Sequence, residues 1–151
     1  MDHVVLVEPE IPWNTGNAGR SCLAFGAQLH LVEPLGFSLS EKMVRRAGVD
    51  YWSNVRPEVH ASWAECEARL PDLGEIWMLS AEAPQALDEV ELAGPAVFVF
   101  GCESTGLDAG IRERYADRLV RIPMLDDRVR SLNLSTTVGI TLYAASLLRA
   151  R

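Results

Sequence analysis

Five short apolar runs recur along this chain, separated by stretches that have the residue spacing of helices. They are residues 4–7, 29–32, 76–79, 97–100 and 119–122. Strands of a parallel sheet have continuous apolar sequences of this length, because helices cover both of their faces. The pattern predicts an α/β fold with a mostly parallel sheet and helices on both faces. No internal repeat or linker interrupts the 151 residues, so we expect a single domain over residues 1–151.

Helical spacing appears in four segments. Asn14 or Thr15 can cap the first helix, which should run to about residue 25 and stop at Gly26. We expect a short second helix over residues 40–48, a weak strand or loop over 51–56, and an amphipathic helix over 61–70. The last helix, residues 135–149, is apolar nearly all round. A helix without a polar face is normally buried against more than its own sheet, so we expect a homodimer interface.

Composition excludes several classes of protein. The hydrophobic fraction is 48% and the charged fraction 23%, which excludes disorder, and the longest apolar run is about five residues, against roughly 18 for a membrane span. The first residues have no secretory signal, so we expect a soluble cytoplasmic protein that binds no membrane. The three cysteines and three histidines are far apart in the sequence, so we expect neither disulfides nor a metal site.

The cationic residues are almost all arginine. Lys42 is the sole lysine among 14 cationic residues, although the net charge is -7. An arginine fork recognises phosphate with two hydrogen bonds, whereas lysine acts as a point charge. The acidic balance argues against indiscriminate nucleic-acid binding, but the arginines leave local phosphate recognition open.

Three polar loops follow predicted strands: residues 79–82, 101–106 and 123–133. Ligands of an open parallel sheet bind beyond the carboxyl ends of its strands, so these loops should converge on a site. Gly101 and Gly106 also fit an ordinary turn. Asn133 or Ser135 can cap the last helix, or this cap region can present backbone N–H groups to a ligand. Arg20 is either a solvated charge or part of the site.

Several motifs together resemble one family, and they lie in order over essentially the whole chain. They are Glu8-Pro9-Glu10-Ile11-Pro12, Asn14-Thr15-Gly16-Asn17 with Arg20, Arg45-Arg46-Ala47-Gly48, Phe100-Gly101 with Glu103, Gly106-Leu107, Ile122-Pro123-Met124, and Ser131-Leu132-Asn133-Leu134-Ser135. The chain resembles the SPOUT-class tRNA 2′-O-methyltransferases, which modify the wobble nucleotide, cytidine or uridine 34.

The resemblance implies a trefoil knot in the C-terminal part, an obligate homodimer, a tRNA anticodon stem-loop as substrate and S-adenosylmethionine as methyl donor, without a metal. It assigns catalysis to Arg20 and Tyr143. The residues that correspond to the donor pocket are Leu79, Gly101, Ile122, Met124, Ser131 and Leu132. We expect RNA to be bound by Arg20, Arg45, Arg46, Arg128 and Arg130.

The chain departs from the family pattern at Trp13, Cys102 and Thr105, and the departures at Trp13 and Thr105 bear on RNA docking and not on methyl transfer. Two other functions stay open: a knotted methyltransferase that acts on another RNA, such as rRNA, and a non-catalytic dimer that binds RNA or a nucleotide. No extra N-terminal RNA-binding domain is recognisable, and this favours tRNA over rRNA. Arg20 and the intact motif 131–135 favour an enzyme.

Overall fold

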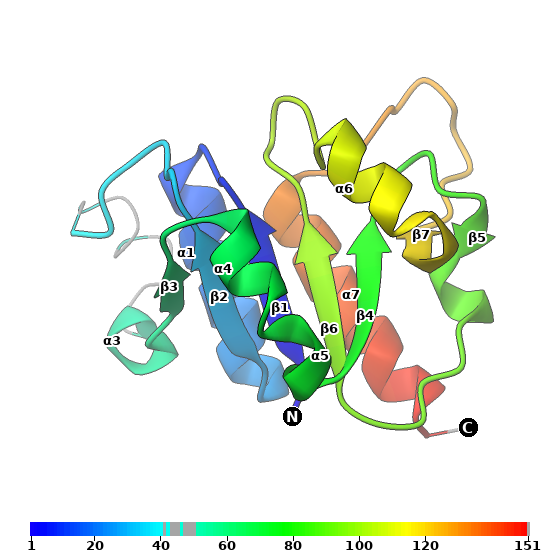
Figure 1. The fold of residues 1–151 in the computed structure, drawn as a ribbon, viewed down its shortest axis with the longest axis horizontal. Coiled ribbons are helices and arrows are strands. Elements are labelled where there is room, and N and C mark those ends of the chain that lie inside the picture. The colour runs from blue at the N-terminus through cyan, green and yellow to red at the C-terminus, as the bar shows by residue number, and fades with distance from the viewer. Residues whose placement is uncertain (41, 43–45, 47–50, 151) are drawn as a thin grey trace.

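Seven strands form one sheet with the order β3-β2-β1-β6-β4-β7-β5 (Figure 1). The computed structural model describes residues 1–40, 42, 46 and 51–150. All the neighbouring strands described are parallel, which confirms the predicted fold class. The strands are β1 (His3–Val7), β2 (Gln28–Val32), β3 (Glu58–His60), β4 (Glu75–Leu79), β5 (Gln85–Ala86), β6 (Ala96–Phe100) and β7 (Leu119–Arg121).

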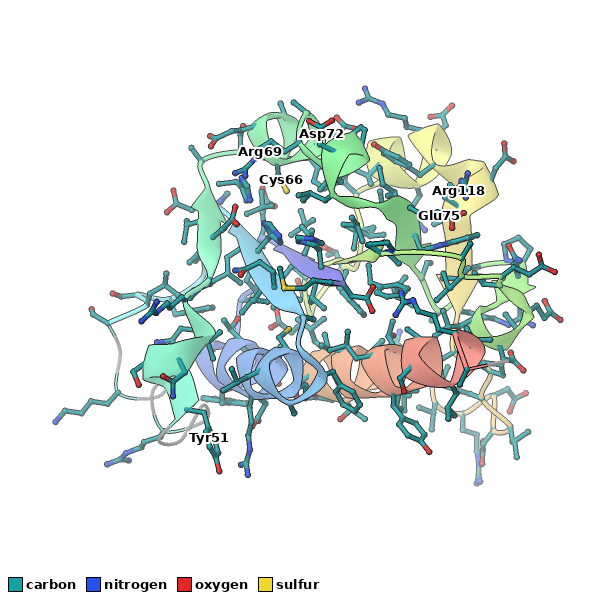
Figure 2. The ribbon with its side chains drawn as sticks, turned by 90° about the horizontal axis from the view of Figure 1, so that it is seen from below. Tyr51, Cys66, Arg69, Asp72, Glu75 and Arg118 are labelled. Atoms are coloured by element: carbon teal, nitrogen blue, oxygen red, sulfur yellow. The ribbon has the colours of Figure 1, made fainter. Side chains whose placement is uncertain are left out.

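Helices cover both faces of this sheet. The longest two, α1 and α7, lie side by side on one face, and α4, α5 and α6 lie on the other (Figures 1 and 2). The helices described are α1 (Pro12–Phe25), α3 (Trp52–Val55), α4 (Trp63–Glu67), α5 (Leu70–Leu73), α6 (Ala109–Arg114) and α7 (Leu134–Leu148), with 3₁₀ turns η2 (Leu87–Glu89) and η3 (Ala116–Arg118).

Alternate residues of the central strands supply two separate cores. Val4 of β1 and Phe98 of β6 pack into the core under α1 and α7, whereas Val5 and Val99 pack into the core under α4, α5 and α6. All four side chains are fully buried. A strand that is buried on both faces needs apolar residues at every position, which explains why the runs were recognisable in the sequence.

The region between β2 and β4 differs from the prediction. The strand or loop expected at residues 51–56 is the short helix α3, and β3 follows it after Arg56, whose φ of 45° turns the chain. The helix expected at residues 61–70 is two short helices, because α4 ends at Glu67 and α5 starts at Leu70 with Pro71 in its first turn. The helix predicted over residues 40–48 lies largely outside the described residues.

The C-terminal part returns from β7 through residues 122–133 to α7, which packs against α1. The trefoil knot implied for this part stays a prediction. Within the described part of the chain, no helix is both long enough and apolar enough to cross a lipid bilayer.

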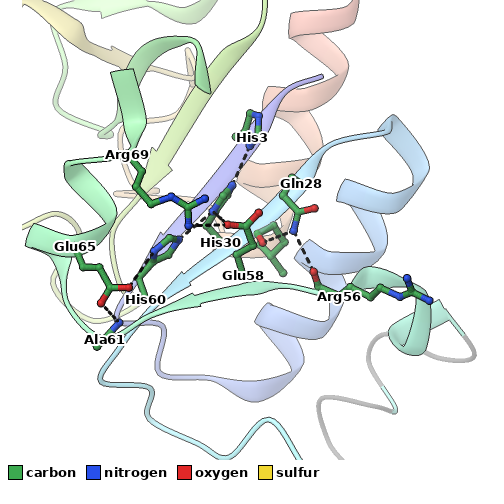
Figure 3. A network of polar contacts seen from close by, with 10 residues as sticks. His3, Gln28, His30, Arg56, Glu58, His60, Ala61, Glu65 and Arg69 are labelled. Atoms are coloured by element: carbon green, nitrogen blue, oxygen red, sulfur yellow. Dashed lines mark hydrogen bonds and ion pairs between the residues drawn. The ribbon is translucent and has the colours of Figure 1, made fainter. Parts of the chain in front are cut away.

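Three histidines that are far apart in the sequence meet on the face of the sheet under α4 (Figure 3). His3 Nδ1 lies 2.9 Å from His30 Nε2, and His30 Nδ1 lies 3.1 Å from His60 Nε2. Their separation in the sequence therefore does not keep them apart in the fold. Burial lowers the pKa of His30 to about 4, and it also lowers the pKa of His3.

Candidate active site

A cavity of about 760 Å³ opens at the carboxyl ends of β4, β6 and β7. The three polar loops that were predicted to converge all contribute to its wall. So do all six residues that the resemblance assigns to the donor: Leu79, Gly101, Ile122, Met124, Ser131 and Leu132. This volume lies within the range of small-molecule sites, about 300–1,000 Å³.

Gly101 allows the loop after β6 to close on itself. A Cβ at this position would lie 2.0 Å from the carbonyl carbon of Gly106 and 2.1 Å from the backbone nitrogen of Leu107. Cys102 and Gly106 form an isolated bridge, and Gly106 has a φ of 70°. Both glycines are thus required by the backbone, and this tight loop places its polar atoms at the cavity wall.

Glu103 joins this loop to the beginning of α1. Its carboxylate accepts hydrogen bonds from the backbone N–H of Glu10 at 2.7 Å, from that of Ile11 at 3.2 Å and from Asn14 Nδ2 at 3.4 Å. The prediction that Asn14 or Thr15 caps this helix is wrong. The helix starts earlier, at Pro12, because a carboxylate from another loop holds the residues that precede it. The predicted stop at Gly26 is confirmed.

In a second contact between the same loops, the acceptor carboxylate belongs to the N-terminal loop. The Glu10 carboxylate accepts from the Ser104 hydroxyl at 2.6 Å and from the Ser104 backbone N–H at 2.9 Å. These hydrogen bonds hold the pKa of Glu10 below its usual value. The N-terminal loop and the loop after β6 are therefore fixed to each other by two carboxylates.

Asn14 extends the connection to α7. Its Oδ1 accepts a hydrogen bond from Asn133 Nδ2 at 3.0 Å. The Oδ1 of Asn133 in turn accepts from the backbone N–H groups of Ser135 and Thr136 and so caps α7. Of the two caps that the sequence left open, Asn133 is the one used. The cap residue also bridges two helices at the cavity.

Three arginines lie in the wall: Arg112, Arg121 and Arg130. Arg112 lies 3.6 Å from the Glu82 carboxylate, and its Nε is buried without a hydrogen-bond partner among the described residues. Arg121 donates to the carbonyls of Ala83 and Pro84. Sequence reasoning assigned a role to Arg130 alone. The signal for Arg121 was its position at the carboxyl end of a predicted strand.

The two residues assigned to catalysis are not in the cavity wall of their own chain, as far as the structure describes it. Arg20 is exposed on α1, with its guanidinium carbon 5.4 Å from the centre of the Tyr51 ring. Tyr143 is 56% exposed on α7 beside Phe25, with ring centres 6.4 Å apart.

The remaining arginines predicted to bind RNA are also outside the wall. Arg128 is exposed and paired with Asp126. Arg46 is exposed, and Arg45 lies outside the described residues. Among the predicted RNA-binding residues that the structure describes, Arg130 alone therefore lies at the cavity.

Comparisons with known proteins agree with this architecture. The model of the SpoU rRNA Methylase family matches residues 1–143. The tRNA (cytidine(34)-2′-O)-methyltransferase of Acidovorax sp. (strain JS42) is 45% identical over 148 residues, which are 96% of this chain and 90% of that protein.

Two solved structures show the same fold. One is described as giving structural insights into the 2-OH methylation of C/U34 on tRNA. It is 40% identical with a TM-score of 0.91, and the match covers 97% of this chain and 94% of that chain. The AdoMet-bound rRNA methyltransferase from Sinorhizobium meliloti is 25% identical with a TM-score of 0.80; the match covers 97% of this chain and 56% of that one. On this evidence the chain belongs to the SpoU rRNA methylase family.

Proposed function

We propose that this protein transfers a methyl group from S-adenosylmethionine to the ribose 2′-hydroxyl of nucleotide 34, a cytidine or uridine, in tRNA. The observation that carries the proposal is the convergence of all six donor-site residues on one cavity. The names of its relatives in the comparisons point to the same reaction. We take residues 1–151 as one methyltransferase domain that acts in the cytoplasm on the tRNA anticodon stem-loop.

The cavity suits the donor. S-adenosylmethionine carries an adenine, ribose hydroxyls and an amino-acid group, and when bound it supplies a methyl group on a positively charged sulfur. Leu79, Ile122 and Leu132 offer apolar surface, and the close loop at Gly101 exposes backbone groups. Arg112 contributes a buried Nε that lacks a partner in the described structure, and such a donor is favourable for a carboxylate.

Arg20 is proposed to act on the RNA. A guanidinium keeps its proton in proteins, so Arg20 is not a general base. It binds the RNA phosphate next to the reacting ribose and stabilises the negative charge that develops on the 2′ oxygen. The hydroxyl proton passes to that phosphate or to water. Positioning the hydroxyl in line with the methyl group supplies much of the acceleration.

We propose that a homodimer completes each site, since Arg20 is absent from the described cavity wall of its own chain. An exposed apolar face supports this assembly. Phe25 of α1 and Tyr143 of α7 are in contact on it, and Leu147 is 48% exposed. Leu23 of α1 and Ile140 of α7 are further exposed apolar side chains of the same two helices.

RNA affinity is proposed to come from arginines pooled across the two subunits, namely Arg20, Arg45, Arg46, Arg128 and Arg130. Single-stranded anticodon bases can be splayed out and stacked on a protein surface, unlike bases in an A-form helix. Trp13 is 51% exposed at the beginning of α1 and offers a ring for such stacking.

The direct test is methylation in vitro. Purified full-length protein is incubated with methyl-labelled S-adenosylmethionine and tRNA transcripts, and the position of the 2′-O-methyl group is mapped. We expect methylation at nucleotide 34. Methylation of rRNA fragments instead would establish the second function, which the family description and the S. meliloti structure favour. Donor binding without methylation of either RNA would indicate a binding protein.

Arg20→Lys tests the proposed catalytic residue. The charge is kept but the two-pronged fork is lost, so we expect methylation to fall by about 10²–10³-fold, as for the loss of a transition-state donor. Donor affinity, measured by calorimetry, should not change. Near-normal turnover in Arg20→Lys would contradict this role.

Tyr143→Asp tests the dimer. A charge on the exposed apolar face should produce monomers in light-scattering measurements and should abolish methylation. Leu125→Asp is the matched control, because Leu125 is fully exposed outside this face. We expect the control to leave the oligomeric state unchanged. A Tyr143→Asp protein that is monomeric and fully active would show that one chain contains a complete site.

A further inference from the structure

A cluster of ligand-forming side chains lies at the β3 edge of the sheet, away from the cavity (Figure 3). One side-chain nitrogen or oxygen of His30, of Glu58 and of His60 lies within 4.8 Å of the other two. None of the three lines the described cavity wall. We propose that they form a binding site for a divalent transition-metal ion of the zinc class.

Strand register brings these residues together. His30 of β2 is opposite Glu58 of β3, and Val32 is opposite His60. Residues 58 and 60 lie on the same side of β3, because side chains alternate along a strand. His30 therefore meets both a carboxylate and an imidazole, although 28 and 30 positions separate it from them in the sequence.

The distances suit a metal ion after small adjustments. His30 Nδ1 is 3.1 Å from His60 Nε2 and 3.8 Å from Glu58 Oε2. Two ligands of a tetrahedral zinc ion, each about 2.0 Å from it, lie about 3.3 Å apart. Two imidazoles and one carboxylate are a zinc ligand set that leaves a fourth position for water.

The surroundings give each imidazole a partner for its other nitrogen. With the ion on His30 Nδ1, the His30 proton lies on Nε2 and is donated to His3 Nδ1, which is 2.9 Å away. His3 then carries its own proton on Nε2, so both rings stay neutral and no proton is lost. A partner of this kind fixes the orientation of a metal-binding imidazole.

His60 supplies an independent observation. Its side chain is almost fully buried, yet Nδ1 has no hydrogen-bond partner among the described residues. The nearest charged oxygen is Glu65 Oε1 at 4.0 Å. With the ion on Nε2, the Nδ1 proton faces this carboxylate and the imidazole becomes a better ligand. The ligand role of Nε2 thus fixes the imidazole proton on Nδ1, and Glu65 is the carboxylate nearest to that proton.

Arg69 competes with the ion. Its Nη1 lies 3.1 Å from Glu58 Oε2, and its charge balances that of the carboxylate (Figure 3). The Arg69 side chain is 53% exposed, so it can swing into solvent. Glu58 is 41% exposed and provides the route of entry. Removing the Arg69 charge should therefore strengthen metal binding.

The test is zinc titration of the full-length protein after chelator treatment, against a chromophoric competitor and without tRNA or donor. We expect one ion per chain. Co²⁺ should give the intense visible absorption of a four- or five-coordinate site. Glu58→Gln should weaken binding by at least about tenfold. Arg69→Gln should strengthen it several-fold, and Glu91→Gln, an exposed carboxylate outside the cluster, should not change it.

His60→Gln should abolish the site. Because His60 is buried, the melting curve of the His60→Gln variant without added metal is compared with that of the parent protein. If this variant does not fold, the half-exposed Glu58 and Arg69 decide the matter. Absence of stoichiometric zinc binding would overturn the proposal, and so would equal zinc affinities for Glu58→Gln and Glu91→Gln. Neither result depends on methyl transfer.

Discussion

Polar side chains are held differently in two regions of this molecule. Around the cavity, Glu103 and Glu10 bind backbone N–H groups of another loop, and they are partly or fully exposed. Under α4, the histidines are buried, and their closest hydrogen-bonding partners are one another. The loop carboxylates thus fix the shape of the cavity edge, whereas the buried imidazoles depend on strand register for their hydrogen bonds to one another.

The two regions also differ in the free-energy cost of losing a hydrogen-bond partner. A partly exposed carboxylate that loses one partner can bind water instead. A buried nitrogen without a partner costs about 1–3 kcal/mol, and His60 Nδ1 is such a group among the described residues. The cavity edge therefore tolerates rearrangement when a ligand enters, whereas the histidine cluster depends on the strand register that brings its rings together.

Gly101→Ala should give the largest effect on the cavity side of this comparison. The added methyl would overlap backbone atoms of Gly106, which cannot move aside as a side chain would. We expect loss of measurable S-adenosylmethionine binding in calorimetry and a fall of about 1–3 kcal/mol in the free energy of unfolding. Gly94→Ala is the control, because no atom lies within 4 Å of the added methyl. Equal donor affinities for both variants would break the comparison.

Glu103→Gln should have a smaller effect. The amide keeps one acceptor oxygen, but the charge that receives three hydrogen bonds is lost. We expect urea unfolding to show a loss of about 0.5–1.5 kcal/mol, together with weaker donor binding, because the beginning of α1 is held less firmly to the loop after β6. Glu113→Gln, exposed on α6, should be neutral. If the two variants unfold alike, the carboxylate does not fix the loops.

Thiol labelling should distinguish the two regions without altering stability. Burial raises the pKa of Cys22 to about 12 and that of Cys66 to about 11, so both should be inert in the folded protein. Cys102 is partly exposed in the cavity wall. We expect a thiol reagent to label Cys102 quickly, and we expect bound S-adenosylmethionine to slow the labelling of Cys102. Rapid labelling of Cys66 would mean that α4 opens above the histidine cluster.

Much of the fold could be predicted from sequence, and the exceptions have a physical pattern. The strands at residues 4–7 and 97–100 are buried on both faces, and their apolar runs needed no tertiary information. β3 was missed, since its sequence, Glu58–His60, is polar. It lies at the edge of the sheet, and its polar residues Glu58 and His60 are opposite His30 and Val32 of β2.

For the site, the loops and their convergence could be predicted, because parallel strands all end at the same edge. The motifs placed the donor residues correctly in the cavity wall, although their binding role stays a prediction. The link from Asn14 to Asn133 could not be foreseen, since no local pattern joins residues 119 positions apart. Nor could spacing show that Arg20 lies on the outer side of α1.

The sequence by itself determined the α/β fold class, the positions of the main strands along the chain and the apolar character of α7. Each of these features can be seen in a local run of apolar residues. A strand buried on both faces, or a helix without a polar face, needs apolar side chains along its whole length. Only the tertiary structure decided that Glu103 holds the beginning of α1 and that His3, His30 and His60 meet. Such contacts depend on strand register and on loop closure, and both are properties of the assembled sheet.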